Sequence, residues 1–124
     1  MAAAYRTNIE SDTLKNKYYR KVEYTDKNMQ LVLMRLLPRE EIGVEAHENI
    51  TQFFRIERGQ GKAIIGKKKY VLEHGVVVIV PPNTLHNIIN TSATDDLLLY
   101  TIYSPPAHAP GKKQIKKQTP DRAA

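Results

Sequence analysis

The stretch GVVVIVPPNTLHNIIN, residues 75–90, decides the fold of this chain. It begins with an apolar run of β-branched residues, Val76 to Val80, which suits a strand better than a helix. The Pro-Pro-Asn segment at 81–83 ends this run, because proline is excluded from the interior of a central strand. A second extended run then begins at His86. We therefore predict a strand, a tight turn and a second strand, with a histidine at the start of the second strand.

Similar short runs recur on both sides of this stretch, with turn signals at intervals of about 8 to 12 residues. The expected strands cover residues 18–24, 31–37, 42–47, 51–58, 62–65, 69–72, 76–80, 86–89 and 97–103. About nine short strands without a convincing helix are typical of an all-β sandwich or barrel. The one helical candidate, residues 112–118, is too short and too charged to be stable without docking.

The length of 124 residues fits one domain. We expect a polar, loosely held leader over residues 1–17, a β-barrel domain over 18–106 and a basic tail over 107–124. The chain has no cysteine, which excludes disulfides and thiolate metal sites. It also lacks a signal peptide and any apolar run near the roughly 20 residues of a membrane span, so we expect a cytoplasmic location.

The net charge of +6 lies largely in the expected tail. One acidic residue there stands against five basic ones, which are Lys112, Lys113, Lys116, Lys117 and Arg122. A solvated tail accounts for this charge. Nucleic-acid binding is the alternative, but no aromatic residue is interleaved with these lysines to stack on bases. The sequence therefore argues against a nucleic-acid partner.

Side chains of the metal-ligand type occur at several of the expected strands. Alternate residues of a strand face the same side, so Glu45 and His47 should point together. Gln52 follows on the next strand, and His86 begins the strand after the turn. If these strands are neighbours, two imidazoles, a carboxylate and an amide oxygen suit a divalent transition metal with open coordination positions. Three alternatives stand beside this: His86 is an ordinary hydrogen-bonded residue, Glu45 faces water, or Asn49 replaces Glu45.

The opening stretch resembles the second motif of the cupin superfamily, G-x5-P-x-G-x2-H-x3-N. Gly75, Pro81, His86 and Asn90 fall on this motif in register. Asn83 stands at the turn glycine of the motif, and asparagine tolerates the left-handed backbone that this glycine provides.

The first cupin motif, G-x5-H-x-H-x3,4-E-x6-G, resembles an upstream stretch in altered form. Gln52 and Gly59 match its E-x6-G, which puts His47 on the second histidine and Glu45 on the first. The leading glycine of the motif has no counterpart, since Arg39 stands there.

The resemblance covers about residues 29–106 and implies a double-stranded β-helix, or jelly-roll, barrel. It also implies that the four candidate positions bind a divalent transition metal such as Mn, Fe, Ni or Zn; these are Glu45, His47, Gln52 and His86. Two residues depart from the family pattern. Gln52 is a neutral and poorer ligand than glutamate, and Val76 stands where an aspartate commonly follows the motif glycine.

The resemblance implies a metal-dependent enzyme that acts on a small molecule in the barrel mouth, of isomerase, dioxygenase or decarboxylase type. Fold alone does not choose among these reactions. Glu45 would be a candidate general base if it is not a ligand. The alternative is a non-catalytic cupin, either a small-molecule-binding module or a metal-stabilised domain. The resemblance also implies a homodimer, and pairing through an edge strand would protect an otherwise exposed edge.

Overall fold

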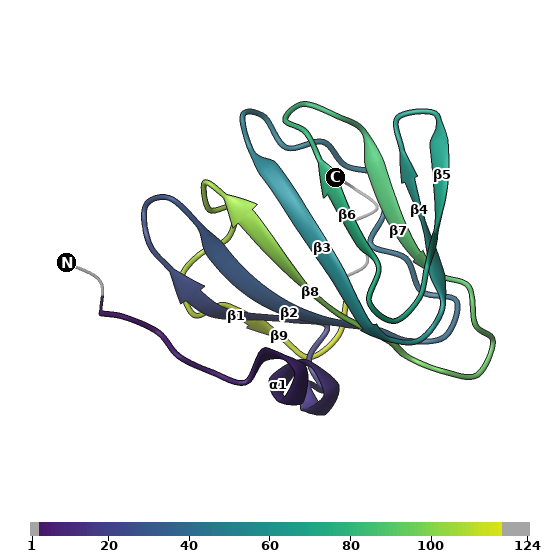
Figure 1. Ribbon diagram of the computed structural model, residues 1–124, viewed down its shortest axis with the longest axis horizontal. Helices are drawn as coiled ribbons and strands as arrows, with labels where there is room; N and C mark the ends of the chain where they lie inside the picture. Colours follow the sequence, from purple (N-terminus) through teal and green to yellow (C-terminus); the bar gives the residue numbers. More distant parts are fainter. Residues whose placement is uncertain (1–2, 118–124) are drawn as a thin grey trace, which may run out of the picture.

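The computed structural model describes residues 3–117, which fold into two antiparallel sheets (Figure 1). The larger sheet has the strand order β6-β3-β8-β2-β1-β9, and the smaller has the order β5-β4-β7. The elements are α1 (Ile9–Lys15), β1 (Arg20–Thr25), β2 (Gln30–Leu36), β3 (Thr51–Arg58), β4 (Gly61–Ile65), β5 (Lys68–Leu72), β6 (Val77–Val80), β7 (His86–Asn90), β8 (Leu97–Ser104) and β9 (Lys113–Gln114). The all-β architecture predicted from the sequence is confirmed.

The core forms from side chains that alternate inward along the strands. In β3, Gln52, Phe54 and Ile56 are buried, whereas Phe53 and Arg55 between them are only half-buried. This is the period of two expected for a strand with one face on the core. The central strands β2 and β8 are buried over most of their length. Removal of these apolar side chains from water is the main force that holds the sheets together.

The turn between β6 and β7 is built by the Pro-Pro-Asn segment, as the sequence predicts. Asn83 has a φ of 62°, in the left-handed region that asparagine tolerates better than most residues. Its N–H donates to the carbonyl of His47 at 2.9 Å, and its Oδ1 accepts from the N–H of Asn49 at 3.3 Å. The turn therefore fixes the backbone of the loop that carries His47.

Helix α1 lies in the segment predicted to be a loosely held leader. Asn8 caps it, since its Oδ1 accepts from the N–H of Ser11 at 3.0 Å. The helix packs against β2, β3 and β8, and Thr13 is completely buried. The prediction of no helix here was wrong, because docking stabilises a short helix that its own sequence would not. Across residues 3–117 there is no helix long and apolar enough to cross a membrane.

Two other segments also differ from the sequence prediction. The candidate helix at 112–118 contains β9, which pairs antiparallel with Arg20 and Lys21 of β1, and residues 118–124 of the expected tail lie outside the described residues. The expected strand at 42–47 is an arm that makes one isolated bridge to β7, with a second just before it at Glu41. Gly43, with a φ of 104°, interrupts its extended backbone.

Candidate metal centre

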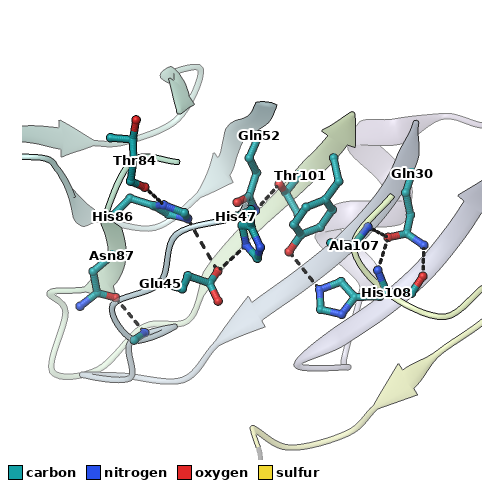
Figure 2. A network of polar contacts seen from close by, with 12 residues as sticks. Gln30, Glu45, His47, Gln52, Thr84, His86, Asn87, Thr101, Ala107 and His108 are labelled. Atoms are coloured by element: carbon teal, nitrogen blue, oxygen red, sulfur yellow. Dashed lines mark hydrogen bonds and ion pairs between the residues drawn. The ribbon is translucent and has the colours of Figure 1, made fainter. Parts of the chain in front are cut away.

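Three of the four predicted ligand side chains meet between the arm and β7 (Figure 2). Nε2 of His47 lies 3.2 Å from Oε1 of Glu45, and Nε2 of His86 lies 3.7 Å from the same oxygen. One potential ligand atom from each residue lies within 4.8 Å of the other two. The predicted convergence of Glu45, His47 and His86 therefore exists in the structure.

Backbone hydrogen bonds hold the arm against β7. Glu45 N–H donates to the carbonyl of His86 at 3.0 Å, and His86 N–H donates to the carbonyl of Glu45 at 2.9 Å. Further along, the N–H of Gly43 donates to Oδ1 of Asn87 at 2.8 Å. The reciprocal pair places Glu45 directly opposite His86, and this pairing brings both side chains to one face.

The ring of His86 is oriented by the residue two positions before it. Its Nδ1 lies 2.9 Å from the carbonyl oxygen of Thr84. A carbonyl can only accept, so Nδ1 carries the proton and the lone pair of the neutral ring lies on Nε2. That nitrogen is buried and has no hydrogen-bond partner in the part of the chain that the structure describes. Metal-binding histidines are commonly held in this way by a backbone carbonyl.

The charges of the three side chains are coupled. Burial alone would raise the pKa of Glu45, but its contacts with His47 and His86 outweigh burial and lower the pKa to about 2. Burial disfavours the protonated form of His86, yet Glu45 and the Thr84 carbonyl together raise the pKa of this imidazole. Glu45 is therefore a carboxylate at neutral pH, which attracts positive charge to the centre.

Gln52, the fourth predicted ligand, is buried on β3 and bonds to the barrel wall. Its Nε2 donates to Oγ1 of Thr101 at 3.0 Å, and its Oε1 has no partner among the described residues. Within residues 3–117 it makes no hydrogen bond to the three clustered side chains. Asn49 is an exposed turn residue with a φ of 60°. Glu45, and not Asn49, lies with the two histidines.

Two polar side chains beside the centre were missed as site residues by sequence reasoning. The ring of Tyr103 packs edge-on against His47 with centroids 5.5 Å apart, and its hydroxyl lies 3.2 Å from Nε2 of His108. Burial, with help from Arg20 and Lys112, lowers the pKa of His108 to about 4. The available signal was the alternation of β8, because Tyr103 is the direct partner of Gln52 across the sheet.

Buried Gln30 fixes the segment that carries His108 (Figure 2). Its Oε1 accepts from the N–H groups of Ala107 and His108 at 3.2 and 2.9 Å, and its Nε2 donates to the His108 carbonyl at 2.7 Å. The start of the expected tail is thus part of the barrel wall.

The donor set fits a divalent transition metal. Imidazole nitrogens and a carboxylate suit Mn, Fe, Ni and Zn, and the unpartnered Nε2 of His86 is a buried polar atom that a metal would satisfy. A cavity of about 160 Å³ has His86 in its wall, together with Val44, Ile64, Gly66, Leu85 and Asn87. Val44 and Leu85, which are 70% and 60% exposed, alternate with Glu45 and His86, so this cavity lies on the other face of the arm and β7 from the metal-ligand atoms.

Comparison with known proteins gives two relatives by sequence. Uncharacterized protein L612 of Acanthamoeba polyphaga mimivirus is 47% identical over 116 residues, which cover 91% of this chain and 72% of that protein. Uncharacterized protein YrkC of Bacillus subtilis (strain 168) is 42% identical over 107 residues, which cover 82% of this chain and 57% of that protein. The chain therefore spans little more than half the length of the Bacillus relative.

A solved structure and a family pattern both agree with the cupin motifs in the sequence. The crystal structure of BH2720 from Bacillus halodurans has a TM-score of 0.88 and 31% identity, and the match covers 90% of this chain and 89% of that chain. The family pattern described as "Cupin domain" matches residues 32–103, more than half of the sequence. The predicted jelly-roll barrel is confirmed, and the chain belongs to the cupin family.

Proposed function

We propose that this cupin binds a divalent transition metal through Glu45, His47 and His86 and uses it in a reaction on a small molecule. The observation that carries the proposal is the buried, unpartnered Nε2 of His86, which lies in a cluster of three ligand atoms within 4.8 Å. Gln52 is a fourth, weaker donor through its unpartnered Oε1. Mn, Fe, Ni and Zn all suit such a set of ligands.

Three protein ligands and a neutral amide leave coordination positions open, which catalytic metal sites require. A bound metal would polarise a carbonyl oxygen or hold a bidentate substrate, chemistry that serves an isomerase or a dioxygenase.

Glu45 serves in this proposal as a ligand and not as the general base. A carboxylate whose pKa is about 2 accepts a proton poorly at neutral pH, whereas an effective base has a pKa near the working pH. Its charge would also offset part of the charge of the ion within a partly buried site. The proton acceptor for a substrate would then be a group outside the ligand set.

The proposal is tested by the metal content of untagged protein, with Glu45→Gln and Glu48→Gln as a matched pair. Glu48 is an exposed glutamate three positions away that lies outside the cluster. Elemental analysis should find close to one equivalent of transition metal in wild-type protein and in Glu48→Gln, and far less in Glu45→Gln. Equal metal content in both variants would remove the assigned ligand set. A stoichiometric metal without turnover of any tested small molecule would favour the non-catalytic cupin.

We also propose a homodimer through the free edge of β6. This strand ends the larger sheet, and its side chains Val77 and Ile79 are 40% and 57% exposed. Exposed β-branched residues on an unpaired edge are a liability that pairing would remove. Sedimentation velocity at micromolar concentration should give a dimer for wild-type protein and for Val71→Lys on β5, and a monomer for Ile79→Lys. A wild-type monomer would contradict the proposal.

A further inference from the structure

A buried carboxylate lies on the opposite side of β3 from the candidate metal centre. Glu57 is 7% exposed, and its Oε1 has no hydrogen-bond partner among residues 3–117. The guanidinium of Arg55 lies 3.5 Å from this oxygen, but it is partly solvated and makes no hydrogen bond to it. A desolvated carboxylate is costly unless it is paired and hydrogen-bonded. Glu57 is therefore a buried charge with incomplete compensation.

The position of Glu57 follows from an irregularity in the sheet. The register between β3 and β8 shifts between Ile56 and Arg58, which leaves Glu57 as the extra residue of a β-bulge. A bulge turns a side chain away from the regular ladder, and such bulges are over-represented beside functional sites. Here the bulge lies between β3 and β8, two of the three strands on which α1 packs.

Two other ligand-type side chains converge on this carboxylate. Glu10 comes from the first turn of α1, and His74 comes from the turn between β5 and β6. One potential ligand atom from each of Glu10, Glu57 and His74 lies within 4.8 Å of the other two. Backbone hydrogen bonds from Gly75 N–H to the Ile56 carbonyl, at 2.8 Å, and from Ile56 N–H to the Val76 carbonyl, at 3.0 Å, fasten the His74 turn to β3.

Two carboxylates this close repel each other, and the repulsion is stronger where one of them is desolvated. A cation bound between the two carboxylates would attract both, so that net attraction would replace their repulsion. The imidazole of His74 selects among cations, because nitrogen ligands suit transition metals and oxygen-only sites suit Mg²⁺ and Ca²⁺.

We propose that Glu10, Glu57 and His74 form a second divalent transition-metal site, suited to Zn²⁺, which fastens α1 to the barrel. The site joins three segments that are far apart in sequence: α1, the bulge of β3 and the β5–β6 turn. Its ion would compensate the buried charge of Glu57 and link the docking of α1 to metal binding. It lies outside the Glu45 cluster and does not depend on the proposed function.

The test is a calorimetric titration of the chelator-treated full chain with Zn²⁺, using His74→Ala and Glu73→Gln as a matched pair. Both residues are exposed in the same turn, so neither change should prevent folding. Wild-type protein and Glu73→Gln should bind an equivalent of Zn²⁺ that His74→Ala loses or binds at least roughly 100-fold more weakly, since loss of a direct ligand should be no smaller than the effect of removing an outer-shell partner. Glu57→Gln should lose the same equivalent, which distinguishes a built site from adventitious surface binding.

Hydrogen–deuterium exchange of residues 9–15 gives an independent readout. Zn²⁺ should slow amide exchange of α1 in wild-type protein and in Glu73→Gln, because ligand binding to the docked state stabilises it. His74→Ala should show no such protection, whereas Glu45→Gln should retain it. Zn²⁺ stoichiometry and α1 protection that are the same in wild-type protein and His74→Ala would overturn the second site, whatever the Glu45 cluster binds.

Discussion

Replacement of Asn90 by alanine should lower the free energy of unfolding by about 3 kcal/mol. Asn90 is completely buried, and its Nδ2 donates to the carbonyls of Leu36, Leu37 and Asp95 at 3.0, 3.0 and 2.8 Å. Its Oδ1 accepts from the N–H of Ser92 at 2.9 Å. The side-chain amide has only two N–H groups, which the three carbonyls share, so these contacts count as two hydrogen bonds. The bond accepted from Ser92 is the third. Each contributes about 1 kcal/mol net, which gives the stated loss.

Urea denaturation followed by circular dichroism measures this loss, provided that the m-value stays constant. Two other asparagines provide a graded control. Asn87 is 5% exposed and makes two side-chain hydrogen bonds, with Gly43 and Glu41, so Asn87→Ala should cost about two-thirds as much. Asn28 is exposed, and no side-chain hydrogen bond is found for it within residues 3–117, so Asn28→Ala should stay within about 0.5 kcal/mol. An Asn90→Ala variant no less stable than Asn28→Ala would contradict the assigned contribution of the Asn90 hydrogen bonds.

Three further predictions concern backbone strain and pH. Gly59→Ala should lower the free energy of unfolding by several kcal/mol more than Gly43→Ala. Both glycines have φ above 100°, but only at Gly59 would a Cβ lie 2.5 Å from the carbonyl oxygen of Asp96. Equal losses of stability in urea denaturation would contradict this clash. In metal-free protein the pKa of Glu45 is lowered from 4.5 to about 2, so ionised Glu45 should contribute up to about 3 kcal/mol to stability. This contribution is present above pH 4.5 and is lost as pH falls towards 2. Glu45→Gln should flatten this part of the plot of stability against pH. The pKa of His108, lowered from 6.5 to about 4, makes stability decline as pH falls from 6.5 to 4; an NMR titration that gives His108 an ordinary pKa would contradict this.

The strands were predictable from the sequence where inward and outward side chains alternate with a period of two. Residues 51–58 match β3 at both ends, because buried and half-buried side chains alternate there and Gly59 ends the run. Helix α1 was not predictable, because its sequence IESDTLK carries no continuous apolar stripe. It depends on the Asn8 cap and on a docking surface made by three distant strands. Sequence periodicity contains no information about such a surface.

The candidate site was predictable only in part. His86 could be placed because the Pro-Pro-Asn turn fixes where β7 begins. The choice between Glu45 and Asn49 could not be made, because counting across an irregular arm does not determine which residue lies opposite β7. The reciprocal backbone hydrogen bonds between Glu45 and His86 make that choice. Tyr103 required the β3–β8 register, which also depends on the tertiary fold.

At the candidate metal centre, backbone groups hold the structure and side chains provide the donor atoms. The donor side chains can therefore be substituted separately from the backbone that positions them. The arm is held opposite His86 by main-chain hydrogen bonds, so the side chains of Glu45 and His86 are not needed to hold it in place. Asn90 is the opposite case, since its side chain is fully used to hold backbone groups. Gln52 stands where the cupin motif has glutamate. Such a change of side chain can alter the strength of a ligand while β3 keeps its pairing with β6 and β8. Substitution at the donor positions should alter metal chemistry while the backbone pairing of the arm and of β3 is kept, whereas substitution at Asn90 should reduce stability and leave the donor atoms intact.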